Sequence, residues 1–175
     1  MNNIDEIKKY ARINHIPVLL NDSAKYLSKL ITQKKPSKIL EIGTAIGYSG
    51  SIMLFSNPQS KLITIEKDEK SYEIAKENFC EMGLNDRVTM ILGDGYEAIL
   101  KLKQDNNKFD FIFLDGPKGQ YIKYYNVLLD ILTDDGCLLV DNVLFRGLVR
   151  SNKDVGHKKR AMINKLRQFL FEIEK

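Results

Sequence analysis

The sequence has little cysteine and no long apolar run, and both shortages exclude classes of protein. Its two cysteines, Cys80 and Cys137, form no CxxC pair. A structural zinc site needs more ligands, so we expect reduced, buried thiols. No apolar run approaches the roughly 20 residues that span a bilayer. Residues 1–15 lack the apolar core of a secretory signal, so we expect a cytoplasmic protein with no membrane association.

Internal repeats, low-complexity segments and linkers are also missing. The length of 175 residues suits one domain, and a hydrophobic content of 43 % is enough to build a core. We therefore interpret residues 1–175 as a single domain.

Short apolar runs alternate with amphipathic segments along the whole chain. The apolar runs predict strands at residues 38–42, 61–65, 88–92, 109–114 and 137–140. The amphipathic segments predict helices at residues 4–14, 22–34, 48–55, 68–82, 95–103, 119–132 and 157–174. This alternation is typical of an α/β fold with a mainly parallel, twisted sheet and helices on both faces.

Particular residues mark the ends of these predicted elements. Asp22 or Ser23 can cap the predicted helix at 22–34. Gly83 can terminate the predicted helix at 68–82. We expect Gly136 to form the turn between the helix at 119–132 and the last strand.

The first three strands end in residues that suit a nucleoside. Gly43 and Gly47 follow the first strand in GxxxG spacing, which differs from the GxGxxG of dinucleotide-binding proteins. Glu66 ends the second strand, where an acid can accept hydrogen bonds from ribose hydroxyls. Asp94 follows the third, where it can bind an adenine amino group or cap the next helix. No phosphate-binding loop is present, and S-adenosylmethionine matches such a site.

The fourth and fifth strands end in oxygen-bearing side chains. Asp115 follows one strand, and Asp141 and Asn142 follow the other. If the strands are neighbours, these side chains converge and provide hard ligands for Mg²⁺, Mn²⁺ or Ca²⁺. Separate helix caps are the alternative. Lys118 lies three residues beyond Asp115, where it can take the proton of a hydroxyl next to the metal, or be a plain surface lysine.

Basic residues are concentrated near the end of the chain. The segment from Arg146 to Arg167 contains eight basic residues and one acid, a net charge of +7, so the other residues carry −3 of the chain's +4. Such a segment indicates a polyanionic partner or a solvated helix face.

Several motifs together resemble one family. EIGTAIGYS at 41–49, FIFLDGPKGQY at 111–121 and LLVDNVLFRG at 138–147 are similar to the metal-dependent class I O-methyltransferases, which include the catechol and caffeoyl-coenzyme A enzymes. The resemblance implies a Rossmann-like methyltransferase fold. It implies metal ligands at Asp115, Asp141 and Asn142, and catalytic roles for Lys118 and Asp115. The implied cofactor contacts are Val18, Glu41, Gly43, Ser49, Glu66, Asp94 and Asp115.

The residues of HIPV at 15–18 and of the other motifs most resemble those of the bacterial tRNA 5-hydroxyuridine methyltransferases. A 5-hydroxyuracil, like a catechol, offers two neighbouring oxygens to a metal. This resemblance implies a tRNA anticodon loop as acceptor, with phosphates held by Arg146, Arg150, Lys158, Lys159 and Arg160. A small catechol-like phenol is the alternative acceptor, and an inactive cofactor- or RNA-binding relative is the alternative to an enzyme.

The resemblance also implies features of the two ends of the domain. Residues 1–35 are expected to form helices that cover the cofactor site. Family members have two further strands after the last helix, whereas this sequence ends at Lys175. We therefore expect the fifth strand to be an exposed edge, which a homodimer could cover.

Overall fold

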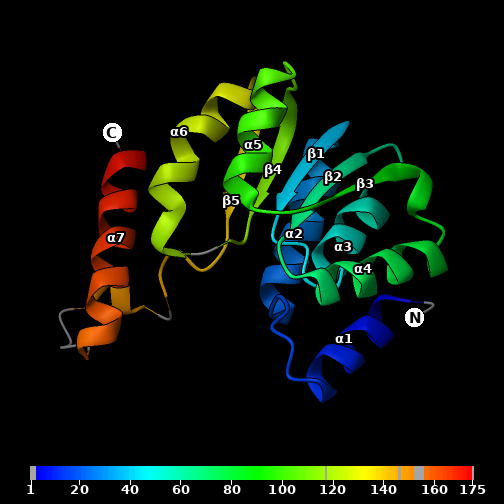
Figure 1. Ribbon diagram of the computed structural model, residues 1–175, viewed down its shortest axis with the longest axis horizontal. Helices are drawn as coiled ribbons and strands as arrows, with labels where there is room; N and C mark the ends of the chain where they lie inside the picture. Colours follow the sequence, from blue (N-terminus) through cyan, green and yellow to red (C-terminus); the bar gives the residue numbers. More distant parts are fainter. Residues whose placement is uncertain (1–2, 117, 146, 152–155, 175) are drawn as a thin grey trace.

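The computed structural model describes residues 3–116, 118–145, 147–151 and 156–174. Its central element is a twisted sheet (Figure 1). In the described residues its strands are β1 (Lys38–Ile42), β2 (Lys61–Glu66), β3 (Val88–Leu92), β4 (Phe109–Leu114) and β5 (Leu132–Val140). They are arranged in the order β3-β2-β1-β4-β5, and every pair is parallel. The predicted parallel α/β fold is confirmed.

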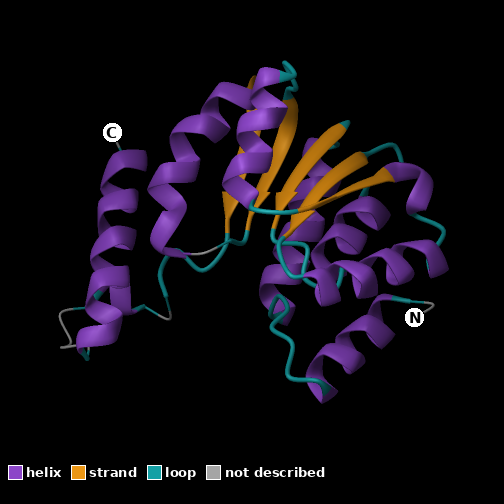
Figure 2. Cartoon of the chain, in the orientation of Figure 1, coloured by secondary structure: helices purple, strands orange, loops and turns teal. Residues whose placement is uncertain are grey.

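Helices cover both faces of this sheet (Figure 2). One face carries α1 (Ile4–Ile13), α2 (Asn21–Lys34), α3 (Tyr48–Ser56) and α4 (Glu69–Glu81). The other carries α5 (Gly95–Gln104), α6 (Tyr121–Ile131) and α7 (His157–Ile173). Short 3₁₀ helices complete the chain: η1 (Asn85–Arg87), η2 (Lys118–Gln120) and η3 (Leu148–Arg150).

The two layers of helices bury two separate apolar clusters. Successive side chains of a strand point to opposite faces, so Ile39 and Phe111 join the cluster under α1 to α4. Leu40 and Ile112 join the cluster under α5 to α7. Because both faces are covered, the strands are continuous apolar runs, which is why the sequence predicted them well.

The register of the strands brings their carboxyl ends to one edge of the sheet. Ile42 pairs with Ile65 on one side and with Leu114 on the other. The Asp115 N–H donates to the Ile42 carbonyl at 2.9 Å, and the Asp141 N–H donates to the Leu114 carbonyl at 3.0 Å. The loops after β1, β4 and β5 therefore start side by side, as the strand-end argument requires.

Three local predictions were wrong. Helix α2 begins at Asn21 after Leu20, which has no side-chain cap, so Asp22 and Ser23 lie inside the first turn. Gly136 lies within β5, because the strand already pairs through Leu132 with Phe109 and then bulges before Cys137 pairs with Phe111. Cys80 is exposed on α4 rather than buried, and Cys137 is half-buried.

Strand β5 is at the edge of the sheet, because β4 is its one partner among the described strands. Within the ranges given above, no helix is long and apolar enough to cross a lipid bilayer.

Candidate cofactor and acceptor site

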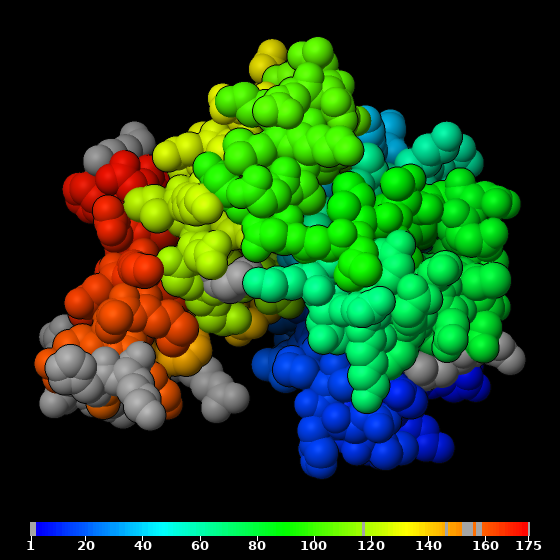
Figure 3. Space-filling model, in the orientation of Figure 1, coloured from blue at the N-terminus to red at the C-terminus, as the bar shows by residue number. Residues whose placement is uncertain are grey.

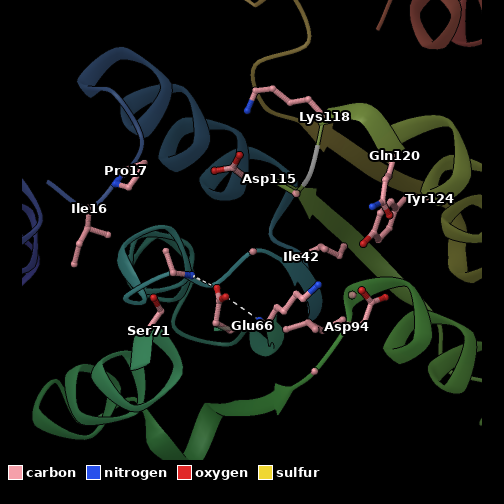
Figure 4. A pocket seen from close by; sticks show the side chains of 17 residues that line it. Ile16, Pro17, Ile42, Glu66, Ser71, Asp94, Asp115, Lys118, Gln120 and Tyr124 are labelled. Atoms are coloured by element: carbon pink, nitrogen blue, oxygen red, sulfur yellow. Dashed lines mark hydrogen bonds between the residues drawn. The ribbon is translucent and has the colours of Figure 1, made fainter. Parts of the chain in front are cut away.

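A cavity of about 460 Å³ opens at the carboxyl edge of the strands (Figure 4). Each of the first four strands contributes the residues at its end or in its following loop. The lining consists of Ile16, Pro17, Ile42, Gly43, Ala45, Ile65, Glu66, Lys67, Ser71, Gly93, Asp94, Gly95, Asp115, Gly116, Lys118, Gln120 and Tyr124. Of the predicted site residues, Gly43, Glu66, Asp94, Asp115 and Lys118 are therefore brought together here.

Gly43 lets the loop after β1 pass close to the loop after β4. Its φ is +100°, and a Cβ at this position would lie 2.3 Å from the carbonyl oxygen of Asp115. A side chain is therefore excluded both by backbone conformation and by contact. The close approach places the glycine turn directly beside Asp115.

Glu66 and Asp94 are held by backbone N–H groups on the opposite side of the cavity from Asp115 and Lys118 (Figure 4). The Glu66 carboxylate accepts hydrogen bonds from Ala45 N at 2.7 Å and from Lys67 N at 2.8 Å. Asp94 caps α5 by accepting from Tyr96 N at 3.0 Å. Helix capping by Asp94 is thus observed, and its exposed carboxylate still borders the cavity.

Glu41 and Ser49 lie beneath the glycine turn rather than in the cavity lining. Glu41 is fully buried, and it accepts hydrogen bonds from Ser49 Oγ at 2.5 Å and from Thr64 Oγ1 at 2.7 Å. Burial raises the pKa of Glu41 from 4.5 to about 7, against the lowering effect of these two hydrogen bonds. This arrangement supports the turn from below, and a direct cofactor contact by Glu41 or Ser49 stays a prediction.

A smaller cavity of about 130 Å³ adjoins the first one and contains the predicted metal ligands. It is lined by Pro17, Val18, Leu19, Leu20, Ser23, Asp115, Lys118, Asp141 and Asn142. Pro17, Asp115 and Lys118 line both cavities. Val18 borders this second cavity rather than the first. The part of residues 1–35 that lines the two cavities is therefore mainly the segment between α1 and α2.

The acidic groups of the smaller cavity are incompletely neutralised. Burial, and then the charge of Asp141, raises the pKa of Asp115 to about 6, whereas Lys118 lowers it. Burial also raises the pKa of Asp141, which accepts a hydrogen bond from the Asn142 side-chain amide. Two half-buried carboxylates and an amide at one point are a donor set that suits a hard divalent cation, because such a cation removes their repulsion.

Tyr121 and Tyr124 from α6 are site residues that the motifs did not predict. The Tyr121 hydroxyl donates to the Asp141 carbonyl at 3.1 Å, and burial raises the pKa of this hydroxyl. Tyr124 lines the large cavity together with Gln120, four residues earlier (Figure 4). The spacing of four residues between Gln120 and Tyr124 could have indicated that both lie on one face of a helix. The same spacing is also found on any buried helix face, so it does not identify a site.

The basic segment is partly occupied by contacts within the protein. Arg167 Nε donates to the Val149 carbonyl at 2.9 Å, and Arg150 lies 3.9 Å from the Glu174 carboxylate. Lys159 and Arg160 are exposed on α7. Arg146 and the side chain of Lys158, also predicted to bind tRNA, lie outside the described residues.

The sheet order and the cavity at the strand ends define a Rossmann-like α/β protein. The sequence profile of the O-methyltransferase family matches residues 3–174. The chain therefore belongs to the O-methyltransferase family.

Individual relatives agree with this assignment. The caffeoyl-CoA O-methyltransferase of Populus kitakamiensis is 31 % identical over 151 residues, which cover 84 % of this chain and 63 % of that relative. The catechol O-methyltransferase of Niastella koreensis is 31 % identical over 130 residues, covering 73 % of this chain and 59 % of that relative. The chain thus spans less than two thirds of the length of both curated relatives.

A solved structure gives the same fold. The O-methyltransferase from Bacillus cereus in complex with SAH superposes with a TM-score of 0.84 at 26 % identity, covering 98 % of this chain and 78 % of that chain. This neighbour confirms the fold expected from the resemblance to methyltransferases.

Proposed function

We propose that this chain is an S-adenosylmethionine-dependent O-methyltransferase. The large cavity would bind the cofactor, with Glu66 accepting from the ribose hydroxyls and Asp94 facing the adenine. The SAH bound in the Bacillus cereus neighbour supports this, because SAH is the product left when the cofactor loses its methyl group. Gly43 would admit the cofactor close to the backbone, next to Asp115.

The smaller cavity would hold a divalent metal and the acceptor. Asp115, Asp141 and Asn142 would be the metal's protein ligands, since they border one cavity and supply hard oxygen donors. When bound, the metal would supply Lewis-acid chemistry that lowers the pKa of an acceptor hydroxyl.

Lys118 would take the proton of that hydroxyl on its Nζ. The acceptor oxygen then forms a bond to the methyl carbon while the bond from that carbon to the sulfonium sulfur breaks. The sulfur keeps the electron pair, and SAH leaves as a neutral thioether. Much of the rate gain would come from holding the two reactants in line, since the residues that line both cavities set their relative position.

One observation carries this proposal: the cavity suited to the cofactor and the cavity suited to the metal share Asp115 and Lys118. The test is methyl transfer from labelled S-adenosylmethionine to a catechol, before and after EDTA treatment. Activity should disappear with EDTA and return with Mg²⁺ or Mn²⁺. Undiminished activity in EDTA would refute the metal assignment.

For the acceptor, we favour 5-hydroxyuridine at the tRNA wobble position, which would become 5-methoxyuridine. Its hydroxyl and adjacent carbonyl are two neighbouring oxygens, and the anticodon loop is single-stranded, so the base can be splayed out. The basic residues of α7 support a polyanionic partner. Nucleoside mass spectrometry of tRNA from cells without the gene should show accumulated 5-hydroxyuridine, and unchanged tRNA would exclude this acceptor.

A catechol-like phenol is the second candidate. It is favoured by the similarity to the caffeoyl-CoA O-methyltransferase of Populus and the catechol O-methyltransferase of Niastella. A phenol carries no phosphates, so turnover of a simple catechol should be insensitive to reversing the charge of Lys159, which is exposed on α7. Comparing acceptor turnover in that variant separates the two candidates.

A further inference from the structure

The proposed function does not use a third cavity, which is larger than the two described above. A groove of about 850 Å³ lies between α1 and the segment that leads into α2. Its lining consists of Asp5, Lys8, Lys9, Arg12, Ile16, Pro17, Val18, Leu19, Leu20, Asn21 and Asp22. We call it the α1 groove. Its α1 wall carries three cations and one acid, and the other wall adds the acid Asp22, so the lining has a net positive charge that favours anions.

The cations of α1 lie along one face of the helix. Lys8, Lys9 and Arg12 are spaced so that they share a face, whereas Ile7 and Ala11 are fully buried on the other. Lys8 Nζ donates to the side-chain oxygen of Asn21 across the groove. Lys9 and Arg12 are exposed, and neither takes part in the ion pairs of the described residues. Both line the groove, so their charges are available to a ligand there.

The α1 groove adjoins the acceptor side of the site. Pro17, Val18, Leu19 and Leu20 line both the groove and the small cavity that contains Asp115 and Asp141. The segment of residues 17–20 thus borders both the groove with the cations and the cavity with the predicted metal ligands. In Figure 3, α1 (blue) and the first turns of α7 (orange) lie on opposite sides of a notch at the lower edge of the molecule.

We propose that the α1 groove binds backbone phosphates of a single-stranded nucleic-acid acceptor, next to the nucleotide whose base enters the small cavity. The proposal rests on the proposed function, because it specifies how that site would hold a polynucleotide. A single strand suits two adjoining cavities, because an unpaired base can be splayed out into one of them while the phosphates of the backbone lie in the other. Arg150 and Arg167 of the other basic region are engaged with Glu174 and with a backbone carbonyl, so these two are less available to phosphates than Lys9 and Arg12.

The test is direct binding of a fluorescein-labelled RNA stem-loop with 5-hydroxyuridine in its loop, followed by anisotropy at several salt concentrations. The double variant Lys9→Glu/Arg12→Glu is compared with Lys25→Glu/Lys29→Glu. This matched control makes the same charge change at two exposed positions of α2 that line a different groove. Lys9→Gln/Arg12→Gln is a milder version of the first variant, in case the charge reversal disturbs α1.

We expect the α1 variant to bind at least about tenfold more weakly than the control. Its salt dependence should fall by about 0.7 in log–log slope for each lost phosphate contact to a single strand. Equal binding by the two charge-reversal variants, or wild-type protein that does not bind the RNA, would overturn the proposal.

Catechol methylation, measured on the same proteins, separates this proposal from the proposed function. It should be unaffected by the α1 variant, because a phenol has no phosphate. If no acceptor is methylated but RNA binding responds as expected, the proposed function fails while the groove assignment stands.

Discussion

The two halves of the site differ in how completely the protein satisfies its own charged groups. On the cofactor side, Glu66 and Asp94 accept hydrogen bonds from backbone N–H groups. On the acceptor side, Asp115 and Asp141 repel each other, and Lys118 is the cation that stabilises their charged forms. The cofactor half is therefore preorganised by the fold, whereas the acceptor half keeps two carboxylates whose charged forms are disfavoured.

This difference indicates a division of work. Backbone N–H donors hold Glu66 and Asp94, the acids proposed to recognise the adenosine part of the cofactor, in place before any ligand binds. Half-buried carboxylates with raised pKa values are unfavourable until a cation binds. Gly43 joins the halves, because its turn touches the carbonyl of Asp115. Asp115 and Lys118 also line both cavities. Changes at residues outside these contacts should alter one half and leave the other intact, and the following predictions test how far the two halves are separable.

The largest effect is expected from Asp141→Asn. This change keeps the shape of the side chain but removes one anionic donor, so methyl transfer should fall roughly 10³-fold, equivalent to the several kcal/mol that a Lewis acid supplies. SAH binding, measured by calorimetry, should persist. Asp130→Asn, at a surface ion pair with Lys103, is the control. Parallel loss of SAH binding would contradict the separation of the halves.

Lys118→Gln should have the next largest effect. Without a proton acceptor beside the hydroxyl, kcat should fall about 10²-fold to 10³-fold, while SAH affinity stays the same. Lys101→Gln, at an exposed position of α5, should behave as wild type. A kcat equal to that of this control would remove Lys118 from the mechanism.

Glu41 should make stability depend on pH. Its pKa is raised from 4.5 to about 7, so the folded state binds its proton more tightly than the unfolded state does. The stabilisation is complete below pH 4.5 and is lost as the pH rises through about 7. The loss should be on the order of 3 kcal/mol.

Urea unfolding of metal-free protein from pH 5 to pH 8 measures this dependence. Glu41→Gln should flatten the decline relative to wild type, because the amide does not titrate. Glu77→Gln, exposed on α4, should follow the wild-type curve. If Glu41→Gln declines as steeply as wild type, the buried carboxyl is not the titrating group.

Glu66→Gln should give the smallest effect of the four. The amide keeps an acceptor but loses the charge, so SAH binding should weaken about tenfold, which corresponds to one charge-assisted hydrogen bond. Divalent-metal affinity, measured separately, should not change. A variant that loses metal binding instead would show that the two halves are coupled.

The strands were predictable because each is a short apolar run buried on both faces. The ranges of β1, β3 and β4 agree with the prediction. The start of α2 was not predictable from capping residues, since Leu20 precedes it and both Asp22 and Ser23 are inside the helix. Tertiary contacts decide such ends, as they decide that Gly136 lies in a bulged strand.

The site was predictable to the extent that it follows from strand ends. Gly43, Glu66, Asp94 and Asp115 follow or end strands, and all line one cavity. The motif could not tell that Glu41 faces inward beneath the turn, because strand alternation gives a face but not the depth of burial. The number of basic residues in a segment likewise does not show which of them are used within the protein, such as Arg167, which donates a hydrogen bond to the Val149 carbonyl.

The most direct test is a crystal structure with SAH and Mn²⁺, using anomalous scattering to locate the metal. We predict one peak within coordination distance of oxygens from Asp115, Asp141 and Asn142, beside the sulfur of SAH. A protein that binds SAH in the large cavity but shows no metal at these three residues would contradict the account.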